Sequence, residues 1–136
     1  MSDDSIERFF DAYAERYMAS DADAIADLYD VPFLAVREGR PIHLGDREAV
    51  REHLVGLMEA YRNAGATRAT IADLHIARLD GANAFTTVRW NALSADGTLL
   101  RDFATTYQML SDERGAWRIL SYVYHDEGGA EDDDIS

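Results

Sequence analysis

The sequence predicts a single α+β domain in which three helices pack on a long, curved, antiparallel or mixed sheet. Three observations predict it. Apolar residues recur with a helical period in three segments before residue 66, and with a period of two in four segments after it. Short turns separate those four segments. The length of 136 residues, 47% of them hydrophobic, is enough for one domain with a core. The expected element order is ααββαββββ.

The first two helices are read from apolar spacing and a capping pattern. Residues 3–19 form one helix, whose apolar stripe is Ile6, Phe9, Phe10, Tyr13 and Tyr17. Ser20, followed by Asp23, starts a second helix with a pair that resembles a capping box. Pro32 then ends helical structure, so two short strands are expected over 31–36 and 41–44.

A third helix and four strands follow. The helix is expected over 47–63, with Asp46 as its N-terminal cap and Gly65 as its C-terminal cap. Asp-Gly pairs and a short polar loop separate the next segments, which favours antiparallel hairpins. The expected strands are Thr70–Leu79, Ala84–Leu93, Leu99–Leu110 and Trp117–His125.

The charge excludes several functions. The chain has 26 acidic and 13 basic residues, and all the basic ones are Arg. Schiff-base chemistry and a P-loop both need Lys, and the chain has no Cys for thiolate chemistry. A net charge of −13 repels phosphate backbones, so we expect no nucleic-acid partner. Such acidity suits a high-salt cytoplasm, and the preference for Arg is equally typical of a GC-rich genome.

The ends of the chain and its hydropathy bear on location. No apolar run is long enough to cross a membrane, and the acidic N-terminus lacks the features of a signal peptide. We therefore expect a cytoplasmic protein without a membrane partner. The domain is expected to span 1–127, and the acidic end, 128–136, to be a disordered tail.

Local motifs point to a family. The segment LYDVPF follows two short helices, a helix follows a Gly-Asp turn, and GAWRI opens the last strand. Together with the element order, these features resemble the nuclear transport factor 2-like superfamily, including its SnoaL-like and ketosteroid isomerase-like members, over residues 4–127. The resemblance implies a cone, with the sheet wrapped around the first helices and a pocket at its open end. It also implies that the outer face of the sheet contacts a second subunit.

The superfamily includes enzymes and non-catalytic members, so specific chemistry must be sought in the residues. By comparison with the isomerases, the tyrosine that holds the enolate oxygen matches Tyr13. The proton-moving aspartate falls on Arg37, and the second acid falls near Thr105 or Thr106. Since both acids are missing, we do not expect steroid-type isomerisation.

Other catalytic patterns are also incomplete. Epoxide hydrolases of the superfamily place two members of an Asp-Arg-Asp set on one strand face, whereas Arg101 and Asp102 are adjacent and point to opposite faces. The four histidines are not at metal-ligand spacing. We therefore expect no metal and no cofactor.

The remaining candidates are aromatic and small polar side chains. On the last strand, Tyr122 and Tyr124 are expected on one face, and Trp117 and Val123 on the other, so that one face serves the core or pocket and the other a homodimer. The polar face of Leu99–Leu110 could line the pocket or face solvent. The candidate ligand-binding residues are Tyr13, Tyr17, Tyr29, Trp90, Asp102, Thr106 and Tyr122.

Three functions remain open. The first is a small-molecule-binding protein with a small hydrophobic ligand and no assignable reaction. The second is a lyase or isomerase acting on a small cyclic or carbonyl compound, with Tyr13 as hydrogen-bond donor and a His or Asp102 as acid and base. The third is a dimeric interaction module whose cone is filled by its own side chains. An open pocket favours the first two.

Overall fold

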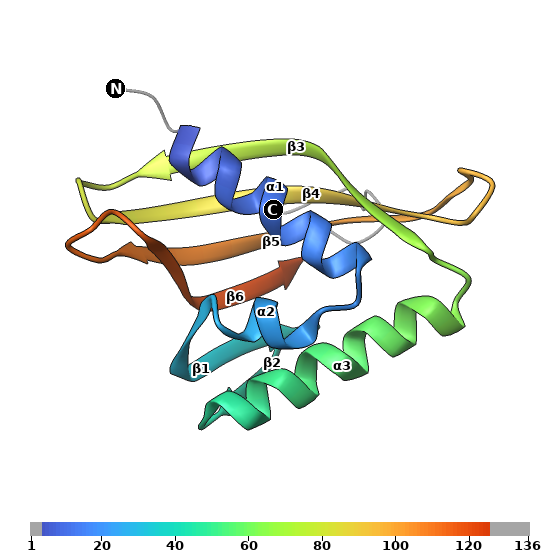
Figure 1. Ribbon diagram of the computed structural model, residues 1–136, viewed down its shortest axis with the longest axis horizontal. Coiled ribbons are helices and arrows are strands. Elements are labelled where there is room, and N and C mark those ends of the chain that lie inside the picture. Colours follow the sequence, from blue (N-terminus) through green and yellow to red (C-terminus); the bar gives the residue numbers. More distant parts are fainter. Residues whose placement is uncertain (1–3, 126–136) are drawn as a thin grey trace.

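A computed structural model describes residues 4–125 and has the predicted order of elements (Figure 1). Within that range the helices are α1 (Asp4–Met18), α2 (Ala22–Ala26) and α3 (Arg47–Asn63). The strands are β1 (Tyr29–Arg37), β2 (Arg40–Leu44), β3 (Arg68–Arg78), β4 (Asn83–Leu93), β5 (Leu99–Ser111) and β6 (Trp117–His125). The tail expected over 128–136 lies outside the described residues.

The strands form one curled, unclosed, mixed sheet in the order β2-β1-β6-β5-β4-β3. The hairpins from β3 to β6 are antiparallel, as predicted, and only β1 and β6 are parallel. Figure 1 shows α1 lying across the long strands, while α2 and α3 lie beside β1 and β2. The α+β class and the three-helix cover are therefore confirmed.

The helix ends follow mainly from local chemistry. Asp46 caps α3, because its carboxylate accepts a hydrogen bond from the amide of Ala49 at 2.8 Å. Gly65 follows α3 with a φ of +96°, which glycine adopts without strain. The prediction for α2 was wrong by one residue. Asp21, not Ser20, is the cap and accepts from the amide of Ala24 at 3.1 Å.

A β-bulge in β6 corrects the predicted faces of the last strand. Met109 pairs with Ile119 and the preceding Gln108 pairs with Ser121, so one residue of β6 is extra. The extra residue reverses the alternation, and Trp117 and Tyr122 both point to the core. Of the four residues that were assigned to faces, only Val123 is exposed, with 43% of its surface accessible. Trp117 therefore does not share a face with Val123, as was predicted.

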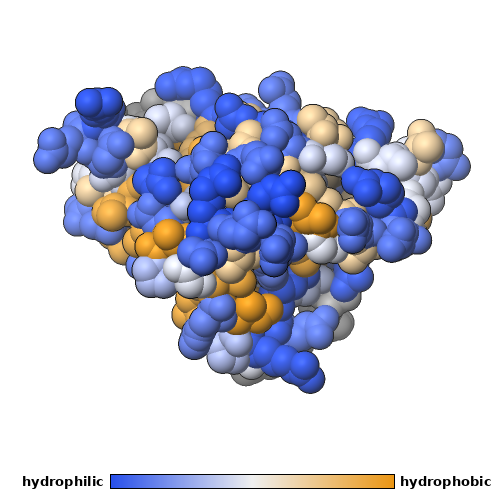
Figure 2. Space-filling view, turned by 60° about the horizontal axis from the view of Figure 1, so that its bottom comes forward, coloured by the Kyte–Doolittle hydropathy of each residue, from blue (hydrophilic) through white to orange (hydrophobic). Residues whose placement is uncertain are grey.

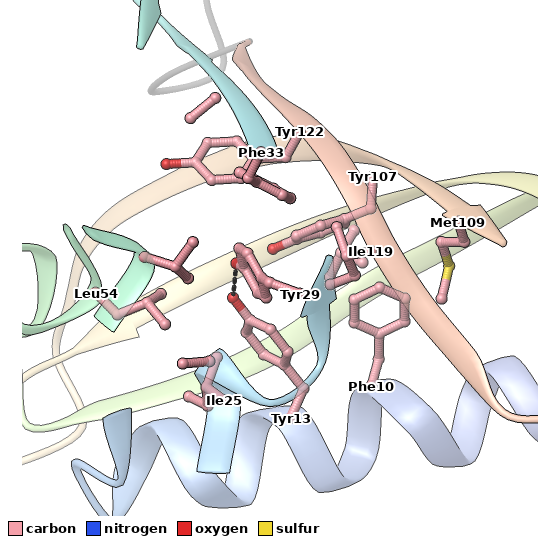
Figure 3. Packing of buried hydrophobic residues seen from close by; sticks show 14 of the residues in the cluster. Phe10, Tyr13, Ile25, Tyr29, Phe33, Leu54, Tyr107, Met109, Ile119 and Tyr122 are labelled. Carbon is pink, nitrogen blue, oxygen red and sulfur yellow. Dashed lines mark hydrogen bonds between the residues drawn. The ribbon is translucent and has the colours of Figure 1, made fainter. Parts of the chain in front are cut away.

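The core lies between α1 and the concave face of the sheet. Phe10 and Tyr13 of α1 pack against Tyr107 of β5, with ring centroids 4.9 and 6.0 Å from the Tyr107 ring (Figure 3). Leu54 of α3 and Ile119 of β6 are also fully buried. Burying such side chains supplies most of the free energy that holds the helices on the sheet.

Arg118 joins the start of β1 to β6. Its guanidinium pairs with Asp30, and donates to the backbone oxygens of Asp27 at 3.0 Å and Tyr29 at 2.8 Å. The register of β1 with β6 shifts between Tyr29 and Leu34. The bonds from Arg118 satisfy backbone acceptors at the start of this irregular stretch. The same bonds fix Tyr29, whose side chain points inward.

The face shown in Figure 2 is mainly hydrophilic, with hydrophobic patches interspersed. No helix within residues 4–125 is both long and apolar enough to span a bilayer.

Candidate functional site

A cavity of about 260 Å³ lies between the C-terminal half of α1, the C-terminal half of α3 and the concave face of the sheet. We call it the aromatic cavity, because eight aromatic side chains line it: Tyr13, Tyr17, Tyr29, Tyr61, Trp90, Phe103, Tyr107 and Tyr122. Every one of the sheet strands except β2 contributes to its wall or rim. The wall is thus apolar over most of its area and carries hydroxyl groups at intervals.

The structure brings five of the seven predicted ligand-binding residues to this cavity. They are Tyr13, Tyr17, Tyr29, Trp90 and Tyr122. Tyr13 and Tyr17 belong to the apolar stripe of α1, and Trp90 lies on the inward face of β4, as its parity with Val88 predicts.

The structure does not bring Asp102 and Thr106 to the aromatic cavity. The inward positions of β5 are Phe103, Thr105 and Tyr107, so the intervening residues point to the outer face of the sheet. There Asp102 accepts from Nη1 of Arg89 at 2.9 Å. The Thr106 hydroxyl lies 2.8 Å from that of Thr87 and also 2.8 Å from Nε2 of His125. The polar strip of β5 therefore belongs to the outside of the cone.

Two hydrogen-bonded pairs organise the floor of the cavity. The hydroxyls of Tyr13 and Tyr29 are 2.8 Å apart (Figure 3), and the indole nitrogen of Trp90 donates to the hydroxyl of Tyr107 at 3.1 Å. Burial raises the pKa of both Tyr13 and Tyr29 far above the ordinary value, so both phenols are neutral. One hydrogen serves the bond between two phenols. The hydrogen of the accepting phenol is left for another acceptor, and the Tyr107 hydroxyl is one hydrogen-bonding neighbour of Tyr13.

A second network, which the sequence did not reveal, lies at the other wall. Nη1 of Arg37 is 3.3 Å from the hydroxyl oxygen of Tyr122, and Nε2 of His53 is 2.6 Å from the same oxygen. Since the guanidinium can only donate, the phenol oxygen accepts from Arg37. That oxygen has a second lone pair, so it accepts from His53 in the tautomer with the proton on Nε2, and the phenol donates to Nε2 in the tautomer with the proton on Nδ1. Both arrangements suit a neutral histidine.

The environment of His53 agrees with that protonation state. Burial lowers the pKa of His53, and the positive charge of Arg37 lowers it further. Burial raises the pKa of Tyr122, and Arg37 opposes this effect. At neutral pH the pair is therefore an uncharged imidazole hydrogen-bonded to an uncharged phenol.

Sequence reasoning did not place either partner beside Tyr122. Arg37 was considered only as the position of a missing acid, and the predicted strand ended at residue 36. The available signal was parity, because Phe33, Ala35 and Arg37 alternate on the inward face of β1. His53 follows Val50 by three residues on α3, a spacing that places it beside the apolar stripe.

The charged side chains around the cavity are arginines. Arg37, Arg62 and Arg68 are in its lining, and within residues 4–125 no Asp or Glu is. Glu38 is the nearest acid in sequence to Arg37, and it lines a neighbouring cavity that shares Arg37 and Tyr61 with the first. A carboxylate that could remove a proton from a bound carbonyl compound is therefore missing from the described wall. No cluster of three potential metal ligands occurs among the described residues either.

Comparison with known proteins agrees with the architecture. The family model described as NTF2-like protein (DUF6841) matches residues 3–127. No curated protein matches the chain. The structure of Aln2 from a Streptomyces species is similar, with a TM-score of 0.72 and 16% identity over 92% of each chain.

Two further structures have the same fold. An NTF-2 like protein of unknown function from Shewanella oneidensis has a TM-score of 0.69 and 17% identity, over 91% of this chain and 98% of that one. An NTF2-like protein with a cystatin-like fold from Novosphingobium aromaticivorans has a TM-score of 0.70 and 17% identity, over 89% and 79%. At such identities the likeness shows the fold alone. Because the family match covers nearly the whole sequence, this chain belongs to the NTF2-like family.

Proposed function

We propose that this protein binds a small molecule in the aromatic cavity. The observation that carries the proposal is an open volume of about 260 Å³ in the place where the core would otherwise close. Ligand sites usually measure roughly 300–1,000 Å³, so this one suits a ligand of one or two rings. Its wall combines apolar rings, which favour a hydrophobic body, with phenol hydroxyls that can orient polar atoms.

A second candidate function is an enzyme, a lyase or isomerase acting on a small cyclic or carbonyl compound. The hydrogen bond between Tyr122 and His53 favours it. With its proton on Nδ1, His53 could take the proton of Tyr122 at Nε2. The phenolate, stabilised by the charge of Arg37, could then remove a proton from one substrate carbon and return it to another, after which Tyr122 recovers its own proton from His53. We rank binding first, because no carboxylate base among the described residues lines the cavity. An interaction module with a filled cone ranks last, since the cone has open volume.

The test is a fragment screen by ligand-observed NMR on three proteins. The first is the wild type. The second is Ala69→Phe, which places a ring in the cavity from β3. The control is Ala77→Phe, which makes the same change on the same strand at an exposed position outside the cavity lining. Thermal melts show that each variant is folded.

We expect one- and two-ring fragments to bind the wild type and Ala77→Phe alike, and to lose affinity for Ala69→Phe. Fragments that bind all three proteins equally would contradict the proposal, as would the lack of any hit on the folded wild type. Incubation of each hit with wild type and with His53→Gln separates the two candidates. A compound recovered unchanged supports binding, and conversion that requires His53 supports the enzyme.

A further inference from the structure

The charge around the aromatic cavity is opposite in sign to the net charge of the chain. The sequence has twice as many acidic as basic residues, 26 against 13. The charged residues in the described lining of this cavity are nevertheless all arginines. Local charge of one sign in a cleft with apolar walls strengthens the potential there and attracts ligands of the opposite sign. The cavity is therefore suited to an anion.

Arg37 is the best placed of the three. Arg62 and Arg68 are exposed, and Arg62 donates to the Ser20 hydroxyl at 2.9 Å. Arg37 is half-buried, and its guanidinium lies 4.2 Å from the centroid of the Tyr124 ring. Its guanidinium donates to the neutral hydroxyl of Tyr122 and is also hydrogen-bonded to Tyr61. Within residues 4–125 no carboxylate forms an ion pair with it.

A half-buried guanidinium without an anionic partner keeps donors for a ligand. Arginine has five N–H groups, and the bonds to Tyr122 and Tyr61 leave others to be used. Stacking on Tyr124 holds the plane of the guanidinium in place, which favours an acceptor that is also planar and has two oxygens. A carboxylate meets this requirement and forms paired, charge-assisted bonds with arginine.

We propose that the ligand of the aromatic cavity is a small aromatic or cyclic carboxylic acid, bound as its carboxylate by Arg37. Its ring lies among the aromatic side chains of the wall. The rings of Tyr61 and Phe103 stack at a centroid distance of 5.7 Å and give this wall a flat apolar surface. Tyr61 also lines the neighbouring cavity together with Arg37, so the flat surface and the guanidinium adjoin. This inference rests on the proposed function and adds the class of ligand.

The experiment compares acids with their neutral amides, by isothermal titration calorimetry. The probes are benzoate with benzamide and 2-naphthoate with 2-naphthamide, which differ in charge far more than in shape. The proteins are the wild type, Arg37→Gln, Arg37→Lys and Arg40→Gln. Arg40 is the cross-strand neighbour of Arg37 and is exposed and outside the cavity lining, so its variant changes the net charge equally.

For the wild type, we expect each acid to bind at least about tenfold more tightly than its amide, since charge-assisted bonds exceed neutral ones. Arg37→Gln should remove that preference, and Arg40→Gln should keep it. Arg37→Lys should retain part of it, because it keeps the charge without the planar fork. Thermal melts on Arg37→Lys guard against a variant that fails to fold.

The outcomes separate this inference from the proposed function. If acids and amides bind the wild type equally, or if Arg37→Gln and Arg40→Gln weaken the acids equally, the cavity binds ligands but the carboxylate class is wrong. Inorganic phosphate competing as well as the naphthoate would also overturn the class. If the four probes fail to bind and the screened fragments bind independently of Arg37, the inference falls and the proposed function stands. If nothing binds in the cavity, both fail.

Discussion

At the scale of single residues, the hydrogen bond between Tyr13 and Tyr29 predicts how Tyr→Phe changes affect stability. Their hydroxyls are 2.8 Å apart and buried, so each is the other's partner. We expect Tyr13→Phe and Tyr29→Phe each to lower the free energy of unfolding by about 1 kcal/mol or slightly more, because each leaves a buried hydroxyl without its partner. The double variant should cost no more than the larger single change. Urea denaturation of the four proteins measures this, and strictly additive losses would show that the hydroxyls are not coupled.

The same pair bears on ligand binding. A fragment oxygen that accepts from the Tyr13 hydroxyl should lose roughly 0.5–1.5 kcal/mol of binding free energy in Tyr13→Phe, whereas a fragment held only by ring contacts should not. If every oxygen-bearing fragment binds the wild type and Tyr13→Phe with equal affinity, Tyr13 does not donate to ligands.

His53 makes stability depend on pH, and the direction follows from its lowered pKa. Histidine ordinarily titrates near 6.5, and in the fold burial and Arg37 lower the pKa of His53. Below pH 6.5 the unfolded chain binds a proton that the folded chain does not yet bind, so acidification favours unfolding. We expect the wild type to lose its stability advantage over His53→Gln as the pH falls from 7.5 to 5. His43→Gln, at an exposed position on β2, is the control. A constant difference between wild type and His53→Gln over this range would refute the assigned environment.

At the scale of elements, the sequence predicts types and boundaries well where local chemistry decides them. The start of α3 was predicted to the residue because Asp46 is a strong cap, and β6 was predicted to the residue because polar turns and the tail bound it. The bulge in β6 could not be predicted, since it arises from pairing with β5 and has no marker residue. It alone places Trp117 in the core together with Tyr122, although the sequence put these two residues on opposite faces.

The sequence predicts the part of the candidate site that local patterns determine. Tyr13, Tyr17 and Trp90 stand out by periodicity and size, which are local properties. The network of Arg37, His53 and Tyr122 joins β1, α3 and β6, residues as much as 85 positions apart. The parallel pairing of β1 with β6 brings Arg37 to Tyr122, and the packing of α3 on β1 adds His53. No local pattern encodes either contact.

The cap of α3 gives a direct prediction at this scale. Asp46→Ala removes the acceptor for the amide of Ala49 and should lower the free energy of unfolding by about 1 kcal/mol. Glu59→Ala is the matched control, because it removes a charge from an exposed position of the same helix without touching the cap. Chemical denaturation measures both, and equal losses would show that charge, and not capping, is what Asp46 contributes.

At the scale of the whole molecule, the net charge of −13 should make folding depend on salt. Repulsion among carboxylates opposes the compact state, and salt screens it. The exposed ion pairs of Arg47 with Asp23 and Asp27 work the other way, but surface pairs contribute little. We expect the melting temperature to rise between low and molar KCl. A flat or falling melting temperature would argue against adaptation to high salt.

Dimer formation through the outer face of the sheet remains a prediction. Because the bulge turns Trp117 into the core, the prediction now depends on other apolar residues of that face. The apolar groups exposed on this face of the described residues include Leu34, Phe85, Leu110 and Val123, each about 40% accessible. They are set among polar residues, including the pair of Arg89 with Asp102. Light scattering at micromolar concentration should give a dimer for the wild type and a larger monomer fraction for Val123→Arg. A monomeric wild type in both low and high salt would exclude this interface.

The central claim, that the aromatic cavity is a ligand-binding site, is tested most directly by a crystal structure of the protein with its tightest-binding fragment. The account predicts fragment density inside the cavity, between the Tyr17 and Trp90 side and the wall of Tyr61 and Phe103, with any carboxylate of the fragment at Arg37. Density for the fragment only elsewhere on the surface, with the cavity closed by its own side chains, would contradict it.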